Sequence, residues 1–127
     1  MNVNDPHTWA RYAEEDWRLA NSLLHRKQPP LRAICFHAQQ SVEKYFKALL
    51  LSKNASFPKT HDLPTLNSLC EQMGILTGFS PEMLTLLSDY AITARYPGEQ
   101  PTLEEAQKAV AIAKTVHKFV HNWLGVK

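Results

Sequence analysis

The segment from Leu31 to Lys53 constrains the fold of this 127-residue chain more than any other. At about 100° per residue, one half of its helical wheel is filled by apolar side chains, including Ile34, Cys35, Ala38, Val42, Tyr45, Phe46 and Leu49. The opposite side carries three polar residues, Gln40, Glu43 and Lys47. This stripe is flanked by Phe36, Leu50 and Leu51. We therefore predict a core helix whose polar stripe faces a second subunit or a ligand rather than bulk water. We also predict a homodimer in which the surface around Phe36, Leu50 and Leu51 is covered by another subunit or by the domain's own loops.

Proline, glycine and capping residues divide the chain into five predicted helices. They run from Asn4-Asp5-Pro6 to about Lys27, from Leu31 to Lys53, from the cap Asp62 to Gly74, from the cap Ser80 to Tyr96, and from the capping box Thr102–Glu105 to Gly125. No segment alternates like a strand. The pattern predicts an all-α fold, a single domain over residues 1–127 that forms an antiparallel up-and-down four-helix bundle with an additional short helix.

The composition fits a globular protein, with 44% hydrophobic and 20% charged residues and a net charge of +2. That charge permits a phosphate-bearing ligand but falls short of the strongly basic balance of a nucleic-acid coat protein. Cys35 and Cys70 lack metal-binding or redox spacing. Without a signal peptide or a long uncharged apolar run, we expect a cytoplasmic protein with no membrane association.

Asp16 interrupts the apolar arc of the first predicted helix, where an unpaired charge is costly. We expect a structural ion pair with Lys44 or, alternatively, Lys47. The competing interpretation places Asp16, half exposed, at the rim of the bundle.

Four motifs resemble the HEPN domain family: Ala13–Asp16, the segment from Phe36 to Leu50, His61-Asp62-Leu63 and Ala94–Pro97. The resemblance covers roughly residues 13–120. It implies a helical bundle that usually dimerises and is often paired with a small nucleotidyltransferase, in a toxin–antitoxin-like arrangement. Family members bind nucleotides or RNA, and many are metal-independent endoribonuclease toxins.

The ribonuclease branch of that family uses an arginine followed after four to six residues by a histidine. The matching arginine is Arg95, but the histidine positions hold Gln100, Pro101 and Thr102. None of these can shuttle a proton near neutral pH as imidazole does. Two other pairs have suitable spacing but lie on other helices, Arg18 with His25 and Arg32 with His37. The sequence therefore does not decide whether the protein is an enzyme. If it is one, Arg95 and His61 are the candidates for catalytic residues.

The predicted ligand site is a cleft that accepts a nucleotide or a phosphate-like anion. Arg95 lies at the C-terminal end of one predicted helix, and His61 precedes the start of another, where N–H groups favour anions. The remaining candidates for its walls are Tyr96, Lys47, Glu43 and Gln40. Several of these residues also have a purely structural interpretation. Asp62, beside His61, can serve only as a helix cap. Arg95 can form an ion pair with Asp89 or Glu99, and Glu43 can form a surface pair with Lys47.

His117 and His121 are four residues apart and can share a metal on one helix face, but no further ligand has suitable spacing. We therefore expect no metal and no resident cofactor. Three functions remain: a dimeric nucleotide- or RNA-binding module acting with a nucleotidyltransferase, a ribonuclease toxin in which His61 or His37 replaces the missing histidine, and a protein-interaction adaptor.

Overall fold

The structure, a computed structural model, describes residues 5–93 and 97–125. These residues form five α-helices and contain no strand: α1 (Pro6–Leu24), α2 (Leu31–Ser52), α3 (Leu63–Gln72), α4 (Pro81–Thr93) and α5 (Leu103–Leu124). The predicted all-α class and the number of helices are therefore confirmed.

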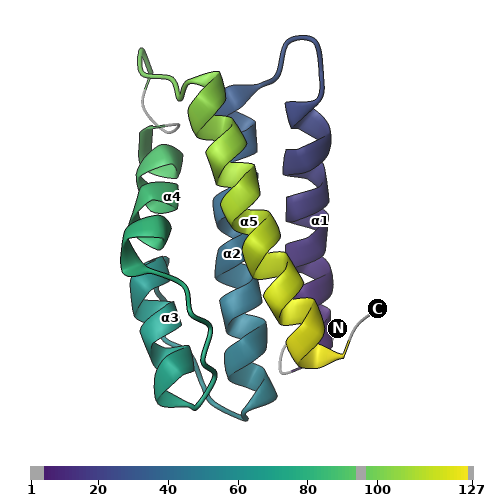
Figure 1. Ribbon diagram of the computed structural model, residues 1–127, viewed down its shortest axis with the longest axis vertical. Helices are drawn as coiled ribbons and strands as arrows, with labels where there is room; N and C mark the ends of the chain where they lie inside the picture. The colour runs from purple at the N-terminus through teal and green to yellow at the C-terminus, as the bar shows by residue number, and fades with distance from the viewer. Residues whose placement is uncertain (1–4, 94–96, 126–127) are drawn as a thin grey trace.

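The helices form a bundle in which α2 and α5 occupy the middle (Figure 1). α1 packs on one side of them, whereas α4 packs against α2 and α5 on the other. α1, α2, α4 and α5 alternate in direction, as an up-and-down bundle requires. The short helix α3 lies below α4 in this view and packs against α2 and α4, so these two helices share the fourth position of the bundle.

Capping side chains mark most helix starts where the sequence predicts them. Asp62 accepts a hydrogen bond from Thr65 N at the start of α3, and Thr102 and Glu105 form a reciprocal capping box at the start of α5. α5 ends at Gly125, whose φ of 71° is left-handed and favours glycine.

The first helix ends at Leu24, three residues before the predicted end at Lys27. The amides of His25 and Arg26 bond back to Ser22 and Leu23, in the tighter i to i−3 pattern of a fraying terminus. Pro29 also disfavours helical geometry at Gln28.

α2 is the core of the bundle. Tyr45, Phe46 and Leu49 are completely buried, and Leu50, predicted to flank a surface stripe, is buried as well. Phe36 keeps 40% of its surface exposed.

The cover over the polar stripe of α2 comes from the chain itself. Trp9 of α1 meets Phe57 of the α2–α3 loop edge to face at 5.5 Å, and both rings lie against Lys47. A second subunit or ligand is not needed to shield Glu43 and Lys47, which are buried within this chain. In the described residues, the helices are too short or too polar to cross a bilayer.

Candidate functional site

Glu43 and His61 form the most distinctive polar pair of the structure. His61 lies in the α2–α3 loop, directly before the cap of α3, and its Nδ1 is 2.8 Å from Glu43 Oε1 on α2. A carboxylate only accepts hydrogen bonds, so Nδ1–H of His61 is the donor. This hydrogen bond fixes the orientation of the ring and leaves Nε2 available to a ligand.

Lys47 supports this pair from the interior. Its Nζ lies 3.0 Å from Glu43 Oε2, and 5.6 Å and 5.3 Å from the ring centroids of Trp9 and Phe57. This position gives Lys47 cation–π contacts with both aromatic rings. Lys47, at 9% exposure, therefore sits behind His61 as the counter-charge of Glu43.

Two glutamines complete the surroundings of Glu43. Gln39 Nε2 lies 3.5 Å from both Glu43 Oε1 and the backbone carbonyl oxygen of His61, at the long limit of a hydrogen bond. Gln40 donates to Gln39 Oε1 at 3.1 Å. Gln40 is therefore linked to the Glu43–His61 pair only through the side chain of Gln39.

His61 borders a groove of about 500 Å³ between the start of α3 and the exposed side of α4. Its lining consists of His61, Asp62, Pro64, Thr85, Ser88 and Ile92. A smaller hollow of about 100 Å³ adjoins His61, Ser88 and Ile92 as well as Gln39. We call these two hollows together the α3–α4 groove.

Asp62 changes the electrostatics expected at this helix terminus. Its side chain accepts from Thr65 N, so a carboxylate already occupies part of the N-terminus that the sequence analysis assigned to a phosphate. An anion in the groove would therefore depend on His61 more than on the helix amides.

Ser88 adds a second unusual feature to the groove. Its Oγ is buried and has no hydrogen-bond partner within the described residues. A buried hydroxyl without a partner is unfavourable, and a ligand with a polar group in the groove would correct this.

Arg95 and Tyr96 lie outside the described residues. Of the family's histidine positions, Gln100 is exposed, Pro101 is buried and Thr102 caps α5. The alternative Arg–His pairs have separate partners. Arg18 donates to Glu14 and His25 contacts the Asn21 carbonyl, whereas Arg32 donates to the Glu99 carbonyl and His37 contacts Asp16.

Asp16 joins α1 to α2 through two contacts. Lys44 Nζ lies 2.6 Å from Asp16 Oδ2, the ion pair expected from the sequence. His37 Nδ1 lies 2.9 Å from Asp16 Oδ1, a contact that the sequence analysis did not include. His37 is half-buried in this network, which makes it less available to a ligand than His61.

A third polar cluster lies between α1 and α5. His117 stacks on Trp17 with ring centroids 4.4 Å apart and contacts the Tyr45 hydroxyl through Nδ1 at 2.5 Å. Burial, reinforced by the neighbouring His121, lowers the pKa of His117 to about 4, so the ring is neutral at pH 7. Glu14 is a neighbour of these histidines that the sequence pattern does not predict, because it precedes His117 by more than a hundred residues.

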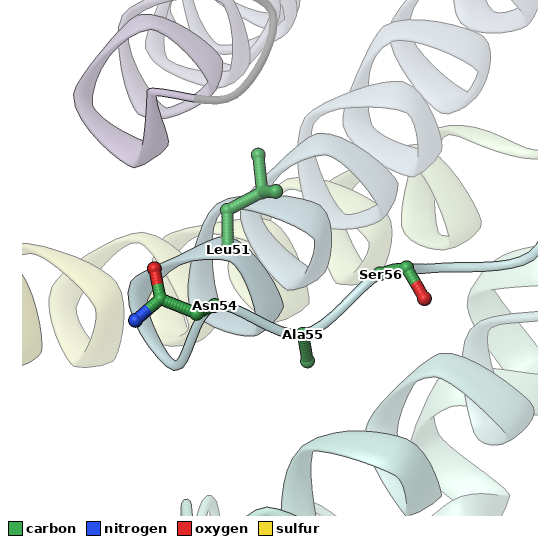
Figure 2. A pocket seen from close by; sticks show the side chains of 4 residues that line it. All are labelled: Leu51, Asn54, Ala55 and Ser56. Atoms are coloured by element: carbon green, nitrogen blue, oxygen red, sulfur yellow. The ribbon is translucent and has the colours of Figure 1, made fainter.

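A further hollow of about 260 Å³ follows α2 (Figure 2). Leu51, Asn54, Ala55 and Ser56 line it. None of these four side chains titrates near neutral pH, so this hollow offers less chemistry than the α3–α4 groove.

Comparison with known proteins agrees with this architecture. The family model described as "HEPN domain" matches residues 7–123. The crystal structure of TT1696 from Thermus thermophilus superposes with a TM-score of 0.75 at 24% sequence identity, covering 94% of this chain and 98% of that chain. None of the curated proteins that were compared matches this chain.

Proposed function

Because this chain belongs to the HEPN domain family, we propose that it binds a nucleotide or a short single-stranded RNA segment in the α3–α4 groove. The main support for this site is the imidazole of His61, which is both exposed and fixed in orientation. Its side chain is 75% exposed at the groove, yet the buried carboxylate of Glu43 fixes its orientation. An oriented and accessible imidazole suits contact with either kind of group: Nε2 of the protonated ring donates to a phosphate oxygen, and Nε2 of the neutral ring accepts from a hydroxyl or amino group.

The rest of the groove fits a nucleoside. Pro64 and Ile92 offer apolar surface to a base, whereas Thr85 and Ser88 offer hydroxyl groups to a ribose. Ser88 Oγ would gain the hydrogen-bond partner that it lacks within the described part of the chain. On the family resemblance, Arg95 supplies a guanidinium to the phosphate and Tyr96 a ring for base stacking; Arg95 follows Ile92 by three residues in sequence.

A second candidate function is metal-independent RNA cleavage, favoured by the Glu43–His61 pair. His61 Nε2 would accept the proton of a ribose 2′-hydroxyl as this oxygen attacks the adjacent phosphorus. The bond from phosphorus to the 5′-oxygen then breaks, which gives a 2′,3′-cyclic phosphate. Solvent water protonates the departing 5′-oxygen to a 5′-hydroxyl, and His61 returns its proton to solvent. Glu43 would hold the imidazole in the required tautomer. His37 is the other histidine that can play this role.

The assembly proposed for this chain is a homodimer that acts with a nucleotidyltransferase in a toxin–antitoxin-like pair. The family resemblance supports it, and the exposed ring of Phe36 offers apolar surface for association. Light scattering at micromolar concentration should give the mass of a dimer, and Phe36→Glu should lower it. A wild-type protein with the mass of one chain would contradict the homodimer.

Fluorescence anisotropy with labelled RNA, with mononucleotides as competitors, tests the binding site. We expect His61→Ala and Arg95→Ala to weaken binding about tenfold each, the scale for losing one charge-assisted hydrogen bond. His25→Ala is the matched control, because His25 is exposed and contacts only its own helix. The melting temperature of His25→Ala should change little, whereas that of His61→Ala should fall modestly because Glu43 loses a hydrogen-bond donor. Equal affinities for the wild type and both site variants would overturn the assignment and favour a protein-interaction adaptor.

Cleavage is tested on the same RNA with a chelator present. Wild type should produce cyclic phosphate ends and His61→Ala should not, whereas Glu43→Gln should retain a reduced rate. Intact RNA in every sample would exclude cleavage of that RNA and leave the binding proposal in place.

A further inference from the structure

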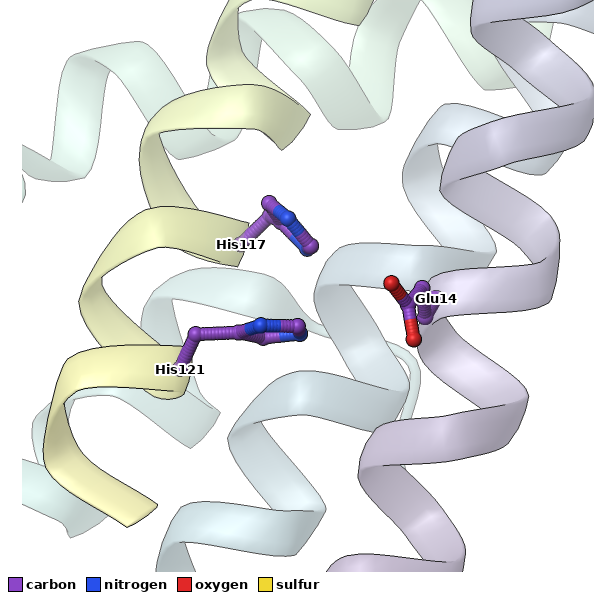
Figure 3. Close-up of side chains that lie close together, drawn as sticks. All are labelled: Glu14, His117 and His121. Atoms are coloured by element: carbon purple, nitrogen blue, oxygen red, sulfur yellow. The ribbon is translucent and has the colours of Figure 1, made fainter. Parts of the chain in front are cut away.

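Three potential metal ligands converge between α1 and α5 (Figure 3). One side-chain donor atom of each of Glu14, His117 and His121 lies within 4.8 Å of those of the other two. Figure 3 shows both imidazoles extending from α5 towards Glu14 on α1. From this geometry we propose that Glu14, His117 and His121 bind a zinc ion.

The spacing of the donor atoms is close to that of an assembled site. Two ligands about 2.0 to 2.1 Å from a tetrahedral zinc ion are about 3.3 Å apart. The observed limit of 4.8 Å therefore requires side-chain movements of about 1 Å, within the range of χ adjustments. α1 and α5 pack directly against each other, so no helix needs to move.

His117 is already held in an orientation suited to coordination. Its ring stacks on Trp17 at an interplanar angle of 8°, and the buried Tyr45 hydroxyl lies 2.5 Å from Nδ1. If Nδ1–H donates to the Tyr45 oxygen, Nε2 carries the free lone pair. Histidine ligands of zinc characteristically donate their second N–H to an oxygen in this way.

The other two groups are also available to a metal. The ring centroids of His121 and His117 are 4.0 Å apart, as expected for neighbours one helical turn apart. Glu14 uses only Oε1 to accept from Arg18, which leaves Oε2 free of any contact with Arg18. The Arg18 side chain is 72% exposed and can move into solvent.

A cavity beside Glu14 and His121 provides room for the remaining coordination position. It has a volume of about 220 Å³ and is lined by His7, Ala10, Arg11, Glu14 and His121. A water molecule needs about 30 Å³, so water can complete a tetrahedral site.

The donor set selects the metal. Two imidazoles and one carboxylate match the ligands of zinc sites that keep an open position, whereas magnesium and calcium prefer oxygen ligands alone. The positive charges of Arg11 and Arg18 near the cavity oppose a dication. We therefore expect weaker binding than at a closed structural zinc site.

Titration of untagged, chelator-treated protein with zinc, by calorimetry and by competition with a chromophoric chelator, tests the proposal. We expect one zinc ion per chain, and cobalt should give the visible absorption of a tetrahedral site. His121→Ala and Glu14→Gln should each weaken zinc binding at least about tenfold, and Tyr45→Phe about tenfold through loss of the hydrogen bond to His117.

His25→Ala removes one exposed histidine outside the cluster and should bind zinc like the wild type. Glu14→Gln keeps the shape of a partly exposed residue, so it remains informative if His121→Ala fails to fold. Absence of zinc binding by the wild type, or equal zinc affinity in wild type and Glu14→Gln, would overturn the proposal. RNA binding in the α3–α4 groove, measured with chelator, is independent of both results.

Discussion

Glu43 Oε1 lies 2.8 Å from His61 Nδ1 and joins a side chain that is 5% exposed to one that is 75% exposed. The interior of the bundle thereby controls the orientation of a group at its surface. Because Lys47 contacts the other oxygen of the same carboxylate, Glu43 serves both the stability of the fold and the proposed site.

Replacing Glu43 by Gln should lower the free energy of unfolding by about 3 kcal/mol. The change removes the charge partner of Lys47, which cannot reach bulk water without moving Trp9 or Phe57. Urea denaturation followed by circular dichroism measures this difference.

The control is Glu104→Gln, which breaks the exposed ion pair between Glu104 and Lys108 on α5. An exposed pair of this kind contributes about 0.5 kcal/mol at most. Equal effects of the two substitutions would show that burial of the Glu43–Lys47 pair has no energetic consequence.

Asp16→Ala should destabilise the protein by about 1 to 4 kcal/mol, because Lys44 and His37 both lose their partner between α1 and α2. A double-mutant cycle with Lys44→Met isolates the ion pair. We expect the losses to be less than additive, with a coupling of about 1 kcal/mol or more. Strict additivity would mean that the 2.6 Å contact contributes no net stability.

Thr102→Ala should lower the free energy of unfolding by about 1 kcal/mol, since it removes the acceptor for Glu105 N in the capping box. Thr115→Ala provides the comparison on the same helix. Thr115 is exposed and bonds only to the Ala111 carbonyl, so alanine should be neutral or slightly stabilising there. In thermal melts, Thr102→Ala should therefore have a lower melting temperature than Thr115→Ala. Equal melting temperatures would contradict the capping role.

Cys35 and Cys70 should not react with a thiol reagent in the native protein at pH 8. Burial raises the pKa of both thiols to about 12, so the thiolate is scarce as well as inaccessible. Both should become reactive in denaturant. Rapid labelling of either thiol under native conditions would show that the core around α2 opens locally.

The helices could be predicted from sequence because their signals are local. Pro81 and the Thr102–Glu105 capping box mark helix starts in any tertiary context, and the apolar arc of α2 repeats within a single helix. Pairing of Asp16 with Lys44 also follows from local reasoning, since a charge inside an apolar arc requires a partner on the adjacent helix.

The site could be predicted only in part, because its contacts are long-range. Glu43 and Lys47 look like a surface pair on the wheel, but the α2–α3 loop folds over them and places Phe57 and His61 against their side chains. Glu14 meets His117 only through the packing of α1 on α5. Loop paths and helix packing are set by the whole fold and have no short-range signal.

The division of the fourth bundle position between α3 and α4 has a consequence for local opening. α4 packs against α2, α3 and α5, while α1, α2 and α5 contact one another without it. α4 can therefore detach in a sub-global fluctuation that leaves those three helices assembled, and its amides should exchange hydrogen faster than those of α2. A ligand held between His61 and Ser88 would bind only the form in which α4 is packed on the bundle. Ligand binding should therefore slow amide hydrogen exchange along α4.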